Sequence, residues 1–122
     1  MKVVYDDLLL DSCLAKGALI SAGFRDIKIV NTLETFEKVL DAELILIDTN
    51  IGDLSGIKII QQFRKDIRGF VCGMSSRDYF PEWRGVADLF LLKSLLYSNP
   101  GDFGERVMKG YAEFRQDRSL SL

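Results

Sequence analysis

The sequence contains no histidine, only two cysteines and two prolines, and no apolar run long enough to cross a membrane. Without histidine, His-based metal sites, His general bases and Ser-His or Cys-His nucleophile pairs are excluded. Cys13 and Cys72 match no metal-binding spacing, so we expect two buried thiols in a reducing compartment. There is no basic excess: 16 basic and 18 acidic residues give a net charge of −2, which disfavours direct nucleic-acid binding.

The composition is that of an ordinary globular protein. Of the 122 residues, 48% are apolar and 28% are charged, which fits a single domain with its own core. We expect this domain to span residues 1–118, followed by a short polar tail over residues 119–122. The first apolar run contains acidic residues and does not resemble a signal peptide, so we expect a cytoplasmic protein without a membrane partner.

Segments with the apolar patterns of strands and helices alternate five times along the chain. The predicted strands are residues 2–5, 26–30, 43–47, 69–74 and 88–92. The predicted helices are residues 12–23, a helix capped by Thr32, residues 56–66, a weak helix over 77–86, and a helix opening at Pro100. This alternation predicts an α/β fold with a parallel sheet covered by helices on both faces.

Polar side chains follow four of the five predicted strands: Asp6 and Asp7, then Asp48, then Ser75, then Lys93. The carboxyl ends of parallel strands meet at one edge of a sheet, and ligands bind there in such folds. We therefore expect these side chains to converge on one site. Asp11 and Asp53, in contrast, are expected to be cap and turn residues.

This set of residues is suited to phosphoryl transfer. Clustered carboxylates repel one another, and a hard cation such as Mg²⁺ relieves the repulsion, with Asp7 and Asp48 as natural ligands and Asp6 close behind. An ionised Asp48 could then attack phosphorus and form an acyl phosphate. The Lys93 ammonium and the Ser75 hydroxyl, with a backbone amide, would hold the phosphoryl oxygens.

Two further features are predicted around this site. A Ser75 hydroxyl that turns towards a new phosphoryl group leaves space that Phe90 could enter, which would make a two-state switch; Ser76 is the alternative to Ser75 if the register differs by one. Large apolar residues near the last helices either pack beneath those helices or form a partner surface. They are Tyr79, Phe80, Trp83, Leu95, Leu96 and Tyr97.

The full set resembles the receiver domain of two-component response regulators, the CheY-like superfamily, over essentially the whole chain. The residues that carry the resemblance are Asp6-Asp7, Asp48 with Gly56 eight positions later, Ser75, Phe90 and Lys93. The resemblance implies a flavodoxin-like (βα)5 three-layer sandwich, with a five-stranded parallel sheet of order 2-1-3-4-5. It also implies that Asp48 is the phosphoacceptor, and that Asp7, Asp48 and the backbone carbonyl of Asn50 bind Mg²⁺, with Asp6 acting through water.

The resemblance further implies the partners. The phosphoryl donor would be a sensor histidine kinase or a phosphotransfer protein. Phosphorylation would switch the face made by the fourth helix, fifth strand and fifth helix, which would contact a downstream effector or output domain, or a second copy of the chain. No enzymatic activity is implied beyond Mg²⁺-dependent self-phosphorylation and slow autodephosphorylation.

The chain departs from the receiver pattern at two positions. Gly52 stands where the family usually has proline, and glycine is expected to loosen that loop. Ser94 follows Lys93 where the family usually has proline, so no cis peptide bond is expected, and residues 94–99 are expected to take their own path.

Three other functions fit the same fold class less well. A receiver-fold interaction module that works without phosphorylation remains the main alternative. A haloacid-dehalogenase-like phosphatase would need an acid two residues after the nucleophile, where this chain has Asn50. A flavodoxin would need a phosphate-binding loop rich in Ser, Thr and Gly after the first strand, and the sequence lacks one.

Overall fold

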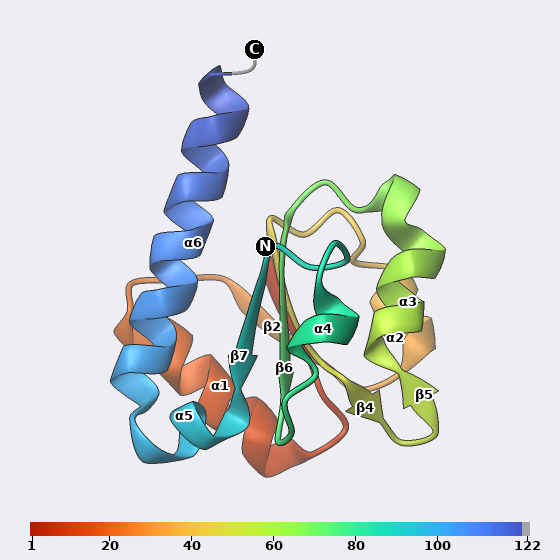
Figure 1. The fold of residues 1–122 in the computed structure, drawn as a ribbon, viewed down its shortest axis with the longest axis horizontal. Helices are drawn as coiled ribbons and strands as arrows, with labels where there is room; N and C mark the ends of the chain where they lie inside the picture. The colour runs from red at the N-terminus through yellow and green to blue at the C-terminus, as the bar shows by residue number, and fades with distance from the viewer. Residues whose placement is uncertain (121–122) are drawn as a thin grey trace.

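The computed structural model describes residues 1–120 and contains one central parallel sheet. Its strands are β1 (Lys2–Tyr5), β2 (Ile27–Val30), β3 (Leu44–Asp48), β6 (Phe70–Ser75) and β7 (Leu89–Leu92). They lie in the order β2-β1-β3-β6-β7, which is 2-1-3-4-5 when the strands of this sheet are counted along the chain. The predicted flavodoxin-like fold is therefore confirmed (Figure 1).

Helices connect these strands and follow the last of them. They are α1 (Leu9–Ser21), α2 (Leu33–Glu37), α3 (Gly56–Phe63) followed by the 3₁₀ turn η1 (Arg64–Asp66), α4 (Phe80–Trp83), α5 (Lys93–Ser98) and α6 (Pro100–Leu120). A small antiparallel hairpin of β4 (Asn50–Ile51) and β5 (Leu54–Ser55) lies between β3 and α3. None of the helices within residues 1–120 combines the length and the apolar character that a membrane crossing requires.

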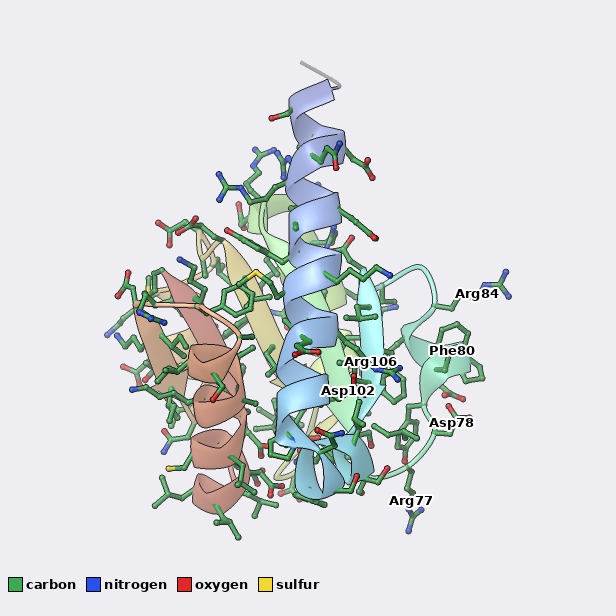
Figure 2. All side chains as sticks on the ribbon, turned by 90° about the vertical axis from the view of Figure 1, so that its left-hand side faces the viewer. Arg77, Asp78, Phe80, Arg84, Asp102 and Arg106 are labelled. Carbon is green, nitrogen blue, oxygen red and sulfur yellow. The ribbon has the colours of Figure 1, made fainter. Side chains whose placement is uncertain are left out.

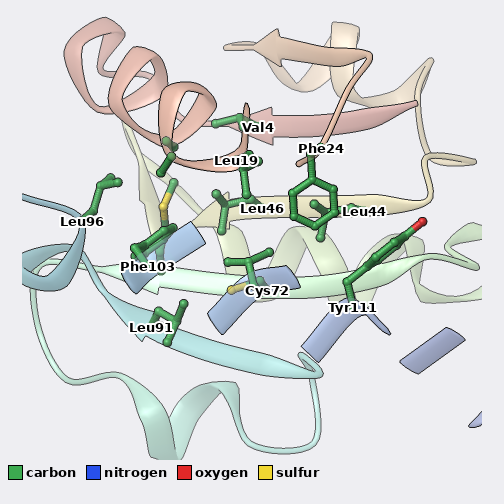
Figure 3. Packing of buried hydrophobic residues seen from close by; sticks show 14 of the residues in the cluster. Val4, Leu19, Phe24, Leu44, Leu46, Cys72, Leu91, Leu96, Phe103 and Tyr111 are labelled. Atoms are coloured by element: carbon green, nitrogen blue, oxygen red, sulfur yellow. The ribbon is translucent and has the colours of Figure 1, made fainter. Parts of the chain in front are cut away.

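Side chains that alternate along the strands supply two apolar cores, one on each face of the sheet. Leu44 and Leu46 of β3 pack with residues of α1 and α6, whereas Ile45 and Ile47 pack with residues of α2 and α3. Figure 3 shows the first core, in which Phe103 of α6 packs against the sheet. Because both faces are covered, the strand ends are the part of the sheet that remains available for polar chemistry.

The last helix, α6, extends beyond the last residue of its predicted inner face, Phe114. Its inner residues Phe103, Val107 and Tyr111 are buried as predicted, and Phe114 is half-buried. The helix then continues through Leu120 and projects past the sheet edge at which the strands begin (Figure 1). It therefore enters the segment predicted as a polar tail, whose residues 121–122 lie outside the described part of the chain.

Other predictions differ from the structure locally. Helix α1 begins three residues before the predicted start, because the Asp6 side chain accepts a hydrogen bond from Leu8 N and orients the first turn. Helix α4 has a single turn: Arg84 leaves the helical conformation and Gly85 follows with a φ of +81°. Cys72 is buried as predicted, whereas Cys13 lies on the exposed side of α1, so the prediction of two buried thiols is wrong for Cys13.

Candidate functional site

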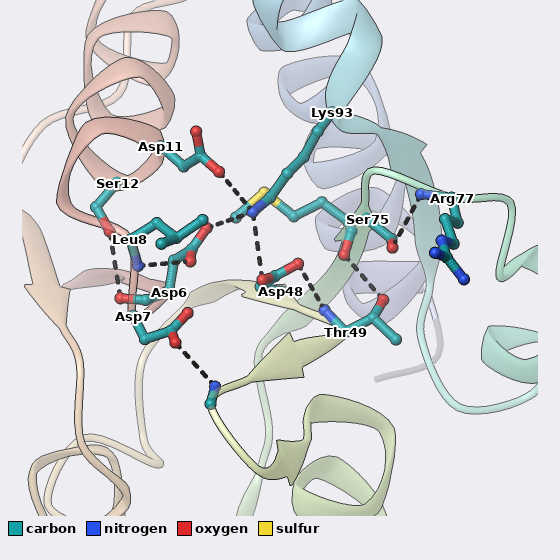
Figure 4. Close-up of polar contacts among 12 residues, drawn as sticks. Asp6, Asp7, Leu8, Asp11, Ser12, Asp48, Thr49, Ser75, Arg77 and Lys93 are labelled. Carbon is teal, nitrogen blue, oxygen red and sulfur yellow. Dashed lines mark hydrogen bonds and ion pairs between the residues drawn. The ribbon is translucent and has the colours of Figure 1, made fainter.

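The register of the sheet brings the predicted site residues to one edge. Tyr5 pairs with Ile47 and Ser75 pairs with Leu92, so the residues just beyond these pairs lie side by side. These residues include Asp6 and Asp48 from neighbouring strands and Lys93 from the end of β7. Figure 4 shows their side chains pointing towards one another at the carboxyl ends of the strands.

Lys93 lies at the centre of this site and is almost fully buried. Its Nζ atom is 2.8 Å from Asp6 Oδ2, 3.2 Å from Asp48 Oδ2 and 2.8 Å from Asp11 Oδ2. An ammonium has three N–H groups, and here each faces a carboxylate. The contact to Asp11 was not predicted, because Asp11 was assigned to a helix cap; that assignment is wrong.

Asp6, Asp7 and Asp48 form a second cluster that overlaps the first. Each residue offers one carboxylate oxygen, and these oxygens all lie within 4.8 Å of one another. Asp6 Oδ2 is buried and lies 2.8 Å from the Lys93 ammonium. Clustered carboxylate oxygens match the preference of Mg²⁺ for hard oxygen ligands. The donor set therefore fits a magnesium ion.

Burial and neighbouring charge determine the ionisation of the site. Burial, followed by the nearby Asp6 carboxylate, raises the pKa of Asp48 to about 6, against the opposing effect of Lys93. Burial also raises the pKa of Asp6, although Lys93 and the Leu8 amide partly offset it. For Lys93, burial would lower the pKa, but hydrogen bonds to Asp11 and Asp6 outweigh it, so the net pKa shift is upwards and the ammonium stays charged.

The backbone after Asp48 is held by hydrogen bonds and by a close contact with α3. Thr49 N donates to Asp48 Oδ1 at 2.9 Å, which leaves Oδ2 to Lys93. Gly56 N donates to Thr49 O at 2.7 Å, and a Cβ atom added at Gly56 would lie 2.0 Å from the Asp48 carbonyl oxygen. Only glycine permits this close approach of α3 to the end of β3, which explains the spacing of eight residues between Asp48 and Gly56.

Gly52 contributes to the site in a way that the sequence did not reveal. It has a φ of +59° in the turn of the β4–β5 hairpin, and its N–H donates to Asp7 Oδ2 at 2.8 Å. Proline has a fixed negative φ and no N–H, so it could not occupy this position in the same way. The expected loose loop is instead a hydrogen-bonded hairpin that holds Asp7 near Asp48. The backbone carbonyl of Asn50 remains a predicted ligand.

Ser75 and Phe90 lie beside this cluster. Ser75 is buried at the end of β6, where its hydroxyl accepts a hydrogen bond from Arg77 N at 3.2 Å, and the alternative residue Ser76 is exposed. Phe90 is half-buried on β7, opposite Gly73 of β6. It lines an open pocket with Asp78, Leu92 and other residues of β7, α5 and α6. The switch role of both side chains remains a prediction.

The predicted partner surface is only partly exposed. Phe80 and Tyr97 are exposed, Tyr79 and Leu95 are half-buried, and Trp83 and Leu96 are buried. For Trp83 and Leu96 the prediction of a surface position is wrong, and the alternative of packing beneath the helices holds. The Trp83 indole covers Gly73, and its Nε1 atom donates to Thr49 Oγ1 at 2.8 Å. Figure 2 shows Phe80 on α4 across from the ion pair of Asp102 and Arg106 on α6.

The segment after Lys93, whose path the sequence left open, forms the short helix α5. The described chain contains no cis peptide bond, and α5 begins directly at Lys93. This short helix carries Tyr97 back towards α1, where its hydroxyl donates to the Asp11 carboxylate at 3.0 Å. Predicting this contact from the sequence would have required the true start of α1, which places Asp11 in the first helical turn and facing the site.

Comparison with known proteins supports the fold. No protein-family model and no curated protein matches the sequence. Among solved structures, a CheY-like response regulator receiver domain protein from Methanospirillum hungatei is similar, with a TM-score of 0.77 and 18% identity, over 94% of this chain and 95% of that chain.

Two further structures extend this comparison. The response regulator protein TrrA from Thermotoga maritima, in complex with Mg²⁺-BeF, has a TM-score of 0.74 and 22% identity over 90% of this chain and 99% of that chain. The signal receiver domain of the putative response regulator NarL from Mycobacterium tuberculosis has a TM-score of 0.69 and 21% identity, over 88% and 91%. The chain therefore has the fold of response regulator receiver domains.

Proposed function

We propose that this chain is a cytoplasmic phosphoacceptor domain of a two-component signalling system, with Asp48 as the acceptor. The observation that carries the proposal is the position of Lys93 Nζ, 3.2 Å from Asp48 Oδ2, beside a cluster of three carboxylates. An ordinary surface aspartate would have neither a buried ammonium partner nor two neighbouring acids. The receiver fold adds independent support for a signalling role rather than enzymatic turnover.

Magnesium fits the site as a cofactor. Asp7 and Asp48 would bind it with the Asn50 carbonyl, and Asp6 would act through water; the bound ion would offset the charge of the carboxylates and of the incoming phosphoryl oxygens. The chain itself prepares the carboxylate for attack. Thr49 N fixes Asp48 Oδ1, and Lys93 lies at Oδ2, so the side chain is held in a single orientation.

The proposed reaction transfers a phosphoryl group from the phosphohistidine of a kinase or phosphotransfer protein. A carboxylate oxygen of Asp48 forms a bond to phosphorus as the P–N bond breaks, and the electron pair leaves with the imidazole, which takes a proton from solvent. Lys93 and Ser75 then hold oxygens of the acyl phosphate. Slow attack by water on phosphorus later restores Asp48 and releases inorganic phosphate.

The signal would leave through the face that contains α4, β7 and α6. A Ser75 hydroxyl that turns towards the phosphoryl group would allow Phe90 to move inward, and this would change the pocket that Phe90 lines. An effector, an output domain or a second copy of the chain would contact this face, where Phe80 is exposed. Trp83, beneath it, is hydrogen-bonded to the residue after Asp48 and can report the change.

The test is a titration with Mg²⁺ and beryllofluoride while Trp83 emission is recorded. We expect a saturable change in the wild type and none in Asp48→Asn, which keeps the side-chain shape but loses the charge. Asp53→Asn is the matched control, because Asp53 is an exposed acid in the adjacent turn and should leave the response intact. An equal response in Asp48→Asn would refute the assignment. Partner binding that ignores both beryllofluoride and Asp48→Ala would instead support the phosphorylation-independent module.

A further inference from the structure

Asp11 gives Lys93 a partner that lies outside the proposed metal site. Asp11 is 5% exposed, and its Oδ2 atom accepts a 2.8 Å hydrogen bond from Lys93 Nζ. The Tyr97 hydroxyl donates to the same carboxylate at 3.0 Å. Helix α1 supplies the acid, and α5 supplies both the lysine and the tyrosine, so these contacts join two elements beside the site. Figure 4 shows the contact between Asp11 and Lys93.

The three carboxylates around Lys93 are not equivalent. Within residues 1–120, the oxygens close enough together to share a cation come from Asp6, Asp7 and Asp48, and Asp11 is not one of them. Two of the partners of Lys93, Asp6 and Asp48, are therefore shared with the proposed metal site, and the third, Asp11, is not. A divalent cation held by Asp7 and Asp48, with Asp6 acting through water, would compete with Lys93 for Asp48 and Asp6 and would repel the nearby ammonium.

We propose that Asp11, oriented by Tyr97, is a positioning residue that keeps Lys93 beside Asp48 when a divalent cation binds. This inference rests on the proposed function, since it concerns the same metal site and the same acceptor. When the metal occupies its ligands, Asp11 still accepts a hydrogen bond from the Lys93 ammonium. The negative charge of Asp11 also offsets the repulsion between the ammonium and the divalent cation. Lys93 and the residues that would hold the metal can then both act on the Asp48 carboxylate.

A merely structural role for Asp11 makes a different prediction. If the carboxylate only ties α1 to α5, its removal would lower the stability of the fold and leave the metal affinity of the folded protein unchanged. If it positions Lys93, its removal would let the ammonium settle on Asp6 and Asp48, where it competes with the cation. The affinity for Mg²⁺ alone, measured by calorimetry on folded protein, separates the two roles.

The experiment compares Asp11→Asn, Tyr97→Phe and the control Asp102→Asn with the wild type. We expect Asp11→Asn to weaken Mg²⁺ binding by roughly five- to tenfold, because the Lys93 ammonium would then compete with the cation for Asp6 and Asp48. Tyr97→Phe should have a smaller effect in the same direction. Asp102→Asn removes an acid of equal charge from an ion pair on α6 and should leave the affinity unchanged.

Heteronuclear NMR of the Lys93 ammonium provides the second readout. In the wild type, its N–H signals should stay protected from exchange with water both with and without Mg²⁺. In Asp11→Asn they should be protected without the metal and lost with it. Wild-type Mg²⁺ affinity in Asp11→Asn, or protection that survives Mg²⁺, would overturn this inference alone. Failure of the wild type to bind Mg²⁺ and beryllofluoride would overturn the proposed function and this inference with it.

Discussion

Trp83 donates its indole N–H to the Thr49 hydroxyl at 2.8 Å, and Thr49 is the residue that follows Asp48. The same hydroxyl donates to the carbonyl of Met74 at 2.9 Å, while Thr49 N binds Asp48 Oδ1. A short chain of hydrogen bonds therefore runs from the proposed acceptor to α4. Trp83 is buried, so a change in its emission would report movement inside the protein rather than contact with a partner.

Thr49→Val tests how much this series of hydrogen bonds stabilises the folded protein. The substitution keeps the volume but leaves the indole N–H of Trp83 buried without an acceptor, so we expect it to lower the free energy of unfolding by about 1–3 kcal/mol. Urea unfolding of Thr49→Val, Trp83→Phe and the double variant measures the coupling. In the Trp83→Phe background the cost of Thr49→Val should be smaller. Simple additivity of the two costs would contradict the role assigned to this hydrogen bond.

The pKa of Asp48 predicts a pH-dependent stability. The folded protein holds the Asp48 proton more tightly than the unfolded chain, because the folded pKa is raised from 3.8 to about 6. The stabilisation from this proton is complete below about pH 4 and is lost as the pH rises through 6. Asp48→Asn does not suffer this loss, and Lys93 keeps Asp6 and Asp11 as partners.

We therefore expect Asp48→Asn to be more stable than the wild type by about 1–3 kcal/mol at pH 8 without divalent cations, with the difference shrinking towards pH 4.5. Urea unfolding across this pH range measures the trend. Asp53→Asn should show little difference at either pH, because its carboxyl group is exposed. A stability difference for Asp48→Asn that does not change with pH would contradict the raised pKa.

Gly56→Ala should damage the site through the backbone. The added methyl group would lie 2.0 Å from the carbonyl oxygen of Asp48, so α3 or the end of β3 must move. We expect a loss of roughly 2–4 kcal/mol in the free energy of unfolding. Gly17→Ala is the matched control, because Gly17 lies in α1 with open space around its Cβ position; there we expect a gain of up to about 1 kcal/mol. Equal effects at the two positions would contradict this explanation.

Gly52→Ala and Gly52→Pro separate the two contributions of the hairpin turn. Alanine keeps the N–H to Asp7 but is strained at a φ of +59°, which should cost about 1 kcal/mol. Proline loses the N–H and cannot adopt this φ, so we expect a larger loss of stability and weaker Mg²⁺ binding. Calorimetric titration with Mg²⁺ checks the second effect. If Gly52→Pro bound Mg²⁺ as tightly as Gly52→Ala, the hydrogen bond to Asp7 would have no role in the metal site.

The sheet and its polar edge were predictable because their signals are local. A buried parallel strand such as β3 is apolar throughout and ends visibly at Asp48, and the same pattern marks the end of β7 before Lys93. Convergence of these residues then follows from the parallel topology. The spacing of Gly56 likewise reflects a close backbone contact that only glycine permits.

The parts that could not be predicted depend on contacts between distant segments. The weak helical pattern around Trp83 suggested a longer α4, but Gly85 and the bond to Thr49 reduce it to a single turn. Asp11 resembles any acid near a helix start, and only the three-dimensional fold shows that it faces Lys93. Leu8 to Leu10 carry no polar start signal, so the first turn of α1 was missed.

The wide separation of the Lys93 partners along the chain has a consequence for synthesis. Lys93 and Asp11 are 82 positions apart, and the contact exists only when β7 has joined the sheet that β1 began. A ribosome-bound chain that ends before β7 would contain Asp6, Asp11 and Asp48 but not the Lys93 ammonium that holds their carboxylates together. Such an intermediate would lack a residue that the proposed phosphoryl transfer requires, so under the proposed function reactivity of Asp48 would itself indicate that folding is complete.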